Sequence, residues 1–494
     1  MDSSSVCHAE HVPSCHAEQK RSIHTGWRAD VWTASSLFLA KISLRPRIEV
    51  ALSTLACMRV PVAFLLVLAL PICKSFYCYI SETLSTACMP VVVFVAPLCN
   101  AAALASLEAL AKQPDISLGV ISHFPQEQLP LHIRLRLAAH WQTASALNTA
   151  ELLYAAEKMH TYFGKIDVLL STNEHVQEAL ALIREKFGIA GMRPDVAHNF
   201  RDKARMKQRF FEHQIPCARF QRLTSRQAAY DFVEQVGFPI ILKPLCGAGS
   251  VSTFFVDSYA QLEPALAQLN PSEWNVALAE EFISGAEHSL ETVMHHGRAV
   301  WQSVSRYLPN ALDVMQNAWI QWRIIVPNAA EQVAYSDIRH AGQAALSCLG
   351  LETGISHLEW FRRPDARFAI SEVGARPPGA QILTLHSRAF DCNLYEEWIR
   401  LMVYDQFSVP TQRYACGVAF LRAQGYGVIK HITGLDEVMR ECSALITDVQ
   451  PPKLHATPTG TYEGDGFIIV RHEETAKVEQ ALEYIINTVR VTLG

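Results

Sequence analysis

Residues 357–373 read HLEWFRRPDARFAISEV, in which two strand-like runs, HLEWF and FAISEV, flank a polar connection that contains a proline. A hairpin centred on residues 365–366 pairs Glu359 directly with Glu372, and both side chains then point to the same face. The apolar residues around the two acids indicate that the hairpin is half buried. Two carboxylates opposite each other destabilise a sheet, so the pattern predicts a hard cation such as Mg²⁺ between them, with phosphate oxygens as further ligands. The alternative is a solvated hairpin with incidental acids.

A second pattern lies upstream, where the short apolar run PIILK, residues 239–243, precedes a loop that contains glycines. Lys243 ends this predicted strand, and the loop carries Gly247, Gly249 and Ser250. Glycines allow the backbone to approach an anion closely, and a lysine near phosphate acts as a point charge. Taken alone, such a motif is more often an ordinary turn than a phosphate site.

Arg376 follows Glu372 by four residues in the run EVGARPPGA. The two prolines and Gly379 hold the chain there in a fixed, non-helical path. An arginine this close to the paired acids is expected to contact a carboxylate or a transferring phosphate through both of its terminal nitrogens. The alternative is a surface arginine that follows a strand.

The order of predicted strands and helices divides the chain into four parts. From Met89, buried apolar strands alternate with helices, which predicts a parallel α/β domain over residues 89–199. Residues 200–409 mix helices and strands around the motifs described above, and residues 410–494 form a small α+β unit. Residues 1–88 match neither pattern and are expected to be an unstructured or wrongly assigned extension.

The first 88 residues contain an apolar run, residues 60–72, that is shorter than the roughly 20 residues a membrane-spanning helix needs. A start at Met58 would place this run where a signal peptide carries its apolar core. We instead expect the true start to be Met89, because MPVVVFVAP is a suitable first strand of an α/β domain. The repeated CHAE sequence near the N-terminus is interpreted as a coincidence and not as a metal site.

Composition narrows the class of protein. The 494 residues are 50% hydrophobic, as in globular proteins. The net charge of −5 argues against a nucleic-acid-binding protein, which would carry an excess of basic residues. Seven of the 13 cysteines lie in the first hundred residues, and the other six are widely spaced without a CxxC pair. Widely spaced thiols of this kind are typical of a reducing compartment, so we expect a cytoplasmic protein without a membrane segment.

Five motifs occur together in one order: DKARMK, FPIILKPLCGAGS, AEEFISGAEHS, HLEWF and SEVGARPPGA. In this order and spacing they resemble the ATP-grasp superfamily, and the resemblance covers about residues 90–494. It implies an α/β protein of the ATP-grasp fold, with an N-terminal parallel α/β domain, a two-lobed α+β ATP-grasp domain and a small C-terminal α+β domain. The run GVAFLRAQGYGVI, followed by GLDEV, is similar to the C-terminal domain of L-amino-acid ligases within that superfamily.

The resemblance implies which residues bind ATP. Two lysines would reach phosphate and the adenine edge, and the glycine loop would cover the triphosphate. The AEEFI segment would hold adenine, and the acid that follows it would bond the ribose hydroxyls. In this sequence the lysines are Lys203 and Lys243, the loop residues Gly247, Gly249 and Ser250, the adenine residues Glu280, Glu281 and Ile283, and the ribose acid Glu287.

The resemblance also assigns the metal and the acyl-phosphate. Glu359 and Glu372 resemble the ligands of Mg²⁺ (or Mn²⁺), and Arg376 resembles the arginine that contacts the acyl-phosphate. Many members carry asparagine two residues after the second metal ligand, where this chain has Gly374. Several amino-acid ligases share that difference, so activity is still expected. His357 shares the face of Glu359 by strand alternation, either as a group that supports the site or as a satisfied core histidine.

Residues 306–323, which begin RYLPN and end NAWIQWR, supply further candidates. Arg306 is expected to contact the triphosphate and Arg323 a substrate carboxylate. Trp319 and Trp322 either line an acceptor pocket or pack in the core, since both readings explain tryptophans equally well.

The resemblance implies an ATP-dependent ligase that forms an amide from a carboxylate and an amine through an acyl-phosphate, with amino acids as substrates. Its partners would be small molecules and not nucleic acid or membrane, and the common state of the family implies a homodimer. The alternatives are another ATP-grasp reaction (a carboxylase, a thiol ligase or a phosphotransferase) or a regulator that binds ATP without turnover.

Overall fold

The computed structural model describes residues 89–494, apart from 248–251, 318 and 424. The chain divides into two units between residues 87 and 88, and all that follows concerns the second unit, residues 88–494. The apolar run at 60–72 and the CHAE repeat, like the loop residues Gly249 and Ser250, lie outside the described residues.

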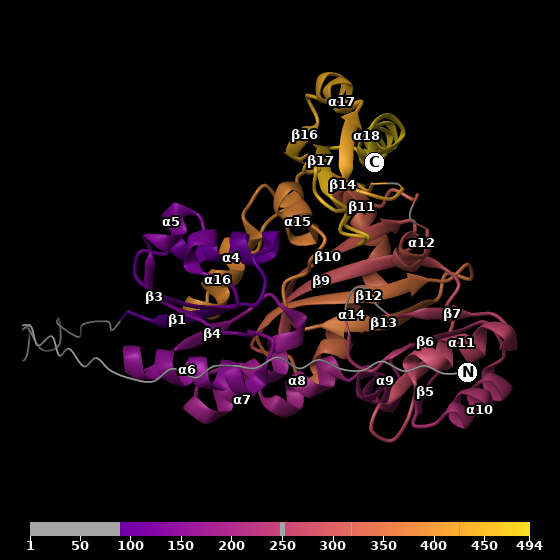
Figure 1. The fold of residues 1–494 in the computed structure, drawn as a ribbon, viewed down its shortest axis with the longest axis horizontal. Helices are drawn as coiled ribbons and strands as arrows, with labels where there is room; N and C mark the ends of the chain where they lie inside the picture. The colour runs from indigo at the N-terminus through magenta and orange to yellow at the C-terminus, as the bar shows by residue number, and fades with distance from the viewer. Residues whose placement is uncertain (1–88, 248–251, 318, 424) are drawn as a thin grey trace, which may run out of the picture. The chain divides into compact units, whose positions relative to one another are not determined.

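The second unit begins with a sheet of four parallel strands, as the alternating pattern predicts (Figure 1). Across the sheet the strands are β3 (Leu137–Gln142), β2 (Ser117–Ser122), β1 (Val91–Ala96) and β4 (Val168–Leu170). The connections contain α4 (Ala101–Ala111), η2 (Gln126–Gln128), α5 (Leu131–Arg134) and α6 (Thr149–Phe163), and η3 (Glu174–Val176) and α7 (Gln177–Phe187) follow β4. Sequence patterning missed β3, because this edge strand is only partly buried and has no continuous apolar run.

A second sheet of four strands is antiparallel and forms one lobe beside the candidate site. In order it contains β5 (Phe220–Leu223), β8 (Ala277–Glu281), β6 (Ile240–Pro244) and β7 (Phe254–Val256). Helices α10 (Arg226–Val236) and α11 (Tyr259–Leu269) cover its apolar face. The predicted buried strand before the glycine loop is therefore β6.

An antiparallel sheet of eight strands forms the other wall of the site. Its order is β13 (Phe368–Gly374), β12 (Gly354–Arg362), β9 (Ala286–His295), β10 (Arg298–Leu308), β11 (Arg323–Val326), β14 (Ala415–Leu421), β17 (Gly466–His472) and β16 (Ile446–Gln450). The last three strands follow residue 410, so the regions expected to be the ATP-grasp and C-terminal domains share one sheet.

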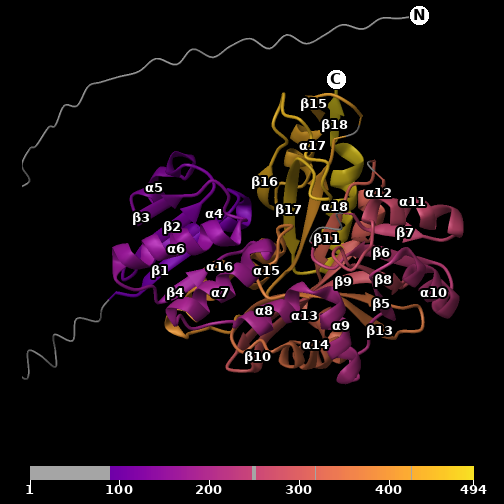
Figure 2. The same cartoon turned by 60° about the horizontal axis from the view of Figure 1, so that its bottom comes forward.

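Further helices pack around this sheet. They are α8 (Pro194–Arg201), α9 (Lys203–Glu212), α12 (Ala311–Gln316), α13 (Ala329–Gln332), η4 (Val333–Tyr335), α14 (Ser336–Leu349), α15 (Ile382–Phe390) and α16 (Leu394–Tyr404). At the C-terminal end, α17 (Leu435–Glu441) and α18 (Thr475–Thr488) accompany the two-stranded sheet of β15 (Ile429–Thr433) and β18 (Arg490–Leu493) (Figure 2). No helix among the described residues is long and apolar enough to cross a membrane.

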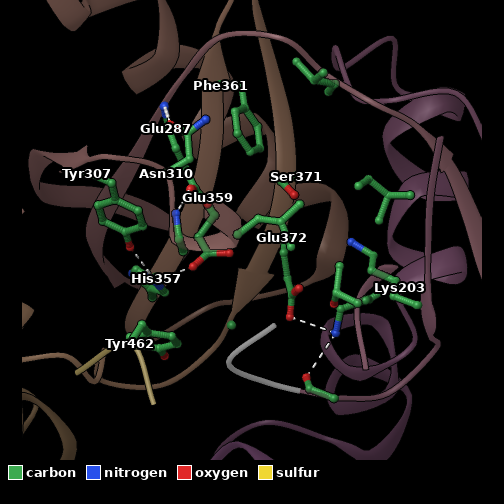
Figure 3. Close-up of a pocket in the computed structure, with 18 of the residues that line it drawn as sticks. Lys203, Glu287, Tyr307, Asn310, His357, Glu359, Phe361, Ser371, Glu372 and Tyr462 are labelled. Carbon is green, nitrogen blue, oxygen red and sulfur yellow. Dashed lines mark hydrogen bonds and ion pairs between the residues drawn. The ribbon is translucent and has the colours of Figure 1, made fainter. Parts of the chain in front are cut away.

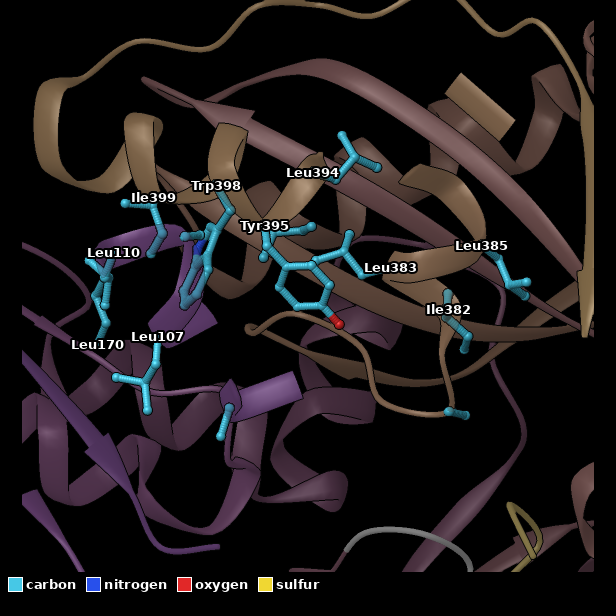
Figure 4. Close-up of a cluster of buried hydrophobic side chains, with 14 of the residues drawn as sticks. Leu107, Leu110, Leu170, Ile382, Leu383, Leu385, Leu394, Tyr395, Trp398 and Ile399 are labelled. Atoms are coloured by element: carbon cyan, nitrogen blue, oxygen red, sulfur yellow. The ribbon is translucent and has the colours of Figure 1, made fainter. Parts of the chain in front are cut away.

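One apolar cluster joins segments that are far apart in the sequence (Figure 4). Leu107 and Leu110 of α4 lie against Trp398 and Ile399 of α16, together with Leu170 of β4. All five side chains are buried. Burial of this apolar surface fixes the parallel sheet against α16, which follows the β12–β13 hairpin and α15 in the chain.

We expect Trp398→Ala to destabilise the protein by about 3–5 kcal/mol, because it opens a cavity where α16 meets α4. Thermal unfolding followed by circular dichroism would show a clearly lower midpoint. The matched control is Trp274→Ala, since Trp274 is 98% exposed and its removal should change stability by less than about 0.5 kcal/mol. Equal midpoints for the two variants would contradict this assignment of the core.

Candidate functional site

A pocket opens between the four-stranded and the eight-stranded antiparallel sheets, with about 1530 Å³ of space when the solvent at its mouth is included. Strands β6 and β8 line one side, and β9, β10, β12 and β13 line the other (Figure 3). The predicted residues that line it are Lys203, Lys243, Gly247, Glu280, Glu281, Ile283, Glu287, Glu359, Glu372 and Arg376. Predicted residues that are spread over more than 170 positions of the sequence, from Lys203 to Arg376, therefore line one cavity.

The two predicted metal ligands do stand opposite each other, because Glu359 of β12 pairs with Glu372 of β13. The pairing depends on a β-bulge, since the ladder shifts between Glu359 and Trp360, and Trp360 pairs with Ile370. Ser371 is the extra residue. Without the bulge, Glu359 would pair with Ser371, and Glu372 would point to the other face.

Lys203 connects the hairpin to the glycine loop. It is the first residue of α9, whose N-cap Asp202 accepts a hydrogen bond from the backbone N–H of Arg205. Its Nζ lies 2.9 Å from Glu372 Oε1 and donates to the carbonyl of Gly247 at 3.0 Å (Figure 3). This ammonium group therefore sits between a candidate metal ligand and a candidate phosphate loop.

Glu280 lies between two buried lysines. Its carboxylate is 3.0 Å from Lys243 Nζ and 3.2 Å from the Nζ of Lys207, which is fully buried. Burial alone would raise the pKa of Glu280, but the two ammonium groups outweigh it and hold that pKa below its ordinary value. The contact of Glu280 with adenine stays a prediction, since the structure gives its oxygens these two lysines as neighbours.

Sequence reasoning missed Lys207, although a signal for it was available. Lys203 and Lys207 are four residues apart on α9 and so share one face of the helix. Besides its contact with Glu280, Lys207 Nζ donates to the carbonyl of Ser371 at 3.0 Å. It therefore holds the β-bulge that turns Glu372 toward Glu359.

The remaining predicted nucleotide residues lie at the end of the pocket beside Phe361. Ile283 is buried next to Phe361, and Glu281 pairs with Arg219 and Arg363 at 2.7 and 3.3 Å. These contacts leave an apolar wall beside a charged rim, which suits a flat heterocycle with a polar edge.

Glu287 faces the centre of the pocket from β9. It accepts a hydrogen bond from the backbone N–H of Ala311 at 2.6 Å, and Asn310 Oδ1 accepts from the N–H of Glu287 at 3.0 Å. Burial, together with the nearby charge of Glu359, raises the pKa of Glu287 to about 8. The site therefore places a buried carboxyl group of raised pKa close to Glu359.

His357 belongs to the site and not only to the core. Its Nε2 lies 3.5 Å from Glu359 Oε1 and 3.4 Å from the hydroxyl of Tyr307. Behind it, the buried carboxylate of Glu291 lies 2.7 Å from His357 Nδ1 and 2.8 Å from His386 Nε2. Burial would lower the pKa of His357, but its bonds to Glu291 and Glu359 raise it to about 9.

Arg376 is held by a residue from the N-terminal sheet region that sequence reasoning missed. Glu174 Oε2 lies 2.6 Å from Arg376 Nε, and its Oε1 lies 3.0 Å from Arg201. A Cβ added at Gly374 would meet Glu174 Oε2 at 2.9 Å. The Glu174 carboxylate thus accounts for the missing asparagine, because it stands where a side chain at position 374 would lie.

The structure does not bring Arg306 and Arg323 into the pocket. Arg306 pairs with Glu331 and Arg323 with Glu483, both at 2.5 Å. Alternation explains this result, since Tyr307 lines the pocket and its neighbour Arg306 must point to the opposite face of β10. Arg323 pairs across the sheet with Leu308, on that same opposite face.

The two tryptophans differ. Trp322 is buried, donates from its Nε1 to the carbonyl of Pro309 at 3.0 Å and lines the pocket. Trp319 is 65% exposed and is not among the lining residues. Tyr462, from the C-terminal region, packs edge-on against Trp322 and closes the pocket on this side.

Comparison with known proteins agrees with this geometry. Residues 200–314 match the family model described as the ATP-grasp domain. The chain is 26% identical over 280 residues to an L-arginine-specific L-amino acid ligase of Bacillus subtilis, covering 56% of this chain and 67% of that protein. It is 23% identical over 269 residues to an alanine–anticapsin ligase of Bacillus subtilis (strain 168), covering 49% and 55%.

Solved structures share the fold. An L-amino acid ligase from Bacillus licheniformis aligns with a TM-score of 0.67 at 16% identity, covering 82% of this chain and 99% of that one. A Staphylococcus aureus N5-carboxyaminoimidazole synthetase complexed with ADP aligns with a TM-score of 0.61 at 14% identity, covering 80% and 97%. These matches confirm the predicted ATP-grasp resemblance and fold.

We expect Lys207→Met to cost about 1–3 kcal/mol, because it removes the ammonium group next to Glu280 and the donor to the Ser371 carbonyl. Loss of the bulge contact should also raise the Mg²⁺ concentration needed for half-maximal ATP binding. Thermal unfolding and a Mg²⁺ titration of fluorescent-ATP binding would measure the two effects. Gln208→Met, one residue further along α9 and exposed, is the control and should change neither. A normal Mg²⁺ titration for Lys207→Met would disprove the link to the bulge.

Proposed function

Because the chain contains an ATP-grasp domain within an ATP-grasp fold, we propose that it is an ATP-dependent ligase that joins a carboxylate to an amine through an acyl-phosphate. The observation that carries the proposal is the pairing of Glu359 with Glu372, next to Lys203 and Lys243, in one pocket. The named relatives favour amino acids as substrates, since they are an L-amino acid ligase and an alanine–anticapsin ligase.

Mg²⁺ or Mn²⁺ fits the residues present at the hairpin. Two carboxylates on paired strands offer the oxygen ligands that such an ion prefers, and the carboxyl group of Glu287 lines the same pocket. When bound, the ion would neutralise charge on the phosphate oxygens. Glu359 and Glu372 would hold it, and Lys203 would share the charge of Glu372 with it.

In the first step, the carboxylate of one substrate would attack the γ-phosphorus of ATP in line, and ADP would leave. Positioning and charge neutralisation supply most of the catalysis in such a transfer. Lys203 and Lys243 would contribute two ammonium groups, since both lie at the pocket beside Gly247 or Glu280.

In the second step, the amine of the other substrate would attack the acyl carbon, and inorganic phosphate would leave. Arg376 would donate to the oxygen on which negative charge develops. The ion pair with Glu174 keeps the guanidinium group in place, so little reorganisation is needed during the reaction. Tyr307, Trp322 and Tyr462 would exclude water at the end of the pocket that receives the amine.

We also propose a cytoplasmic homodimer without a nucleic-acid partner. The cysteines of the described region are all free, which suits a reducing compartment. Light scattering of the purified chain would measure the oligomeric state directly.

We expect the chain to release ADP and phosphate from Mg-ATP only with particular pairs of amino acids, in a matrix of acids and amines. Glu372→Gln should lower that turnover on the order of 100-fold or more, because an amide cannot replace a metal-binding carboxylate. Glu352→Gln, at an exposed position before β12, is the matched control and should leave turnover unchanged.

The outcomes separate the alternatives. ADP release that requires bicarbonate and no amine would point to a carboxylase. Binding of ATP without ADP release in any pair would refute the ligase and favour the regulator.

A further inference from the structure

Three side chains with metal-binding groups meet at the far end of the β9–β10 hairpin. β9 ends at His295, and His296 and Gly297 form the two-residue turn before β10. Asp405 directly follows α16. The Nε2 atoms of His295 and His296 lie 2.8 Å from Asp405 Oδ1 and Oδ2 respectively. None of the three lines the pocket described above.

The backbone turns both histidines to the same side. Successive residues of a strand normally point to opposite faces, so adjacent histidines seldom share a partner. Here His296 has a φ of 50° and Gly297 a φ of 76°, the left-handed pair of a tight hairpin turn. This turn stacks the two imidazoles with 4.3 Å between ring centroids.

The third group is also fixed by its backbone. Asp405 caps the C-terminus of α16 with a φ of 57°, and its backbone N–H donates to carbonyls of the last helical turn. The carboxylate therefore comes from a defined helix end and meets a defined hairpin turn. The backbone therefore already brings the three side chains together, and binding a common ligand would require no rearrangement of the chain.

The ligand atoms suit a divalent transition metal. They lie within 4.8 Å of one another, and this is the one such group of three found in the described part of the chain. A tetrahedral Zn²⁺ ion about 2.0–2.2 Å from imidazole nitrogen and carboxylate oxygen would separate its ligand atoms by roughly 3.3–3.6 Å. The 2.8 Å contacts would open by about 0.5–0.8 Å, which small side-chain rotations can supply.

We propose that His295, His296 and Asp405 bind a divalent transition metal ion of the zinc type, at a site separate from the nucleotide pocket. Two neutral imidazoles and one carboxylate carry a single negative charge, and each imidazole proton moves to Nδ1 when Nε2 binds the ion. The side chains of His296 and Asp405 are 69% and 60% exposed, so water completes the coordination. The ion would tie the hairpin turn to the end of α16.

The test is a Zn²⁺ titration of the EDTA-treated full-length chain by calorimetry, with excess Mg²⁺ present. His296→Asn and Asp405→Asn remove a strong ligand but keep the backbone, because asparagine also adopts the left-handed conformation. The control is His455→Asn, since His455 is another exposed histidine with a positive φ, 64°. We expect each site variant either to bind one Zn²⁺ equivalent fewer or to bind Zn²⁺ at least tenfold more weakly. The control should give the same Zn²⁺ isotherm as the parent chain.

Identical Zn²⁺ isotherms for the parent chain and both site variants would overturn the proposal and leave two histidines hydrogen-bonded to an aspartate. Electron paramagnetic resonance with Cu²⁺ gives a second readout. Coupling to two imidazole nitrogens is expected in the parent chain and to one in His296→Asn, and equal spectra would also overturn the site. Neither result depends on ligase activity.

Discussion

The close approach of Glu359 and Glu372 is the constraint on which the rest of the site depends. Two carboxylates on adjacent strands repel each other, and the surroundings must compensate for that repulsion in the absence of a ligand. Lys203 does so directly for Glu372, and the bonds to His357 do so for Glu359. The two carboxylates are thus held close together in the pocket by neighbouring positive and hydrogen-bonding groups.

Much of this arrangement was predictable from short windows of sequence. The sequence pattern places Glu359 and Glu372 on the two strands of one hairpin, but it does not predict the bulge that brings them opposite each other. Glu174 was not predictable in this way, because its partner Arg376 lies 202 residues away and only the tertiary fold brings them together. Arg306 was misplaced because the residue type was considered without the face of the strand that carries it.

The shared sheet explains a further difference from the expectation. Sequence patterning divides the chain near residue 410, since turn-forming residues there interrupt the helices and strands. Yet β14 pairs with β11 along its length, and Tyr462 returns to the pocket. Hydrogen bonding between strands that are distant in sequence leaves no local pattern in the sequence. The domain boundary predicted near residue 410 therefore falls within one continuous sheet.

The bulge at Ser371 determines which face of the hairpin the side chain of Glu372 occupies. The outer half and the inner half of the hairpin differ by one residue in register, and that single residue decides on which face the second carboxylate emerges. During evolution, gain or loss of one residue between Glu359 and Glu372 would turn an acid out of the cavity, whereas a change of two would preserve the facing pair. The number of residues between Glu359 and Glu372 therefore decides whether both carboxylates face the cavity.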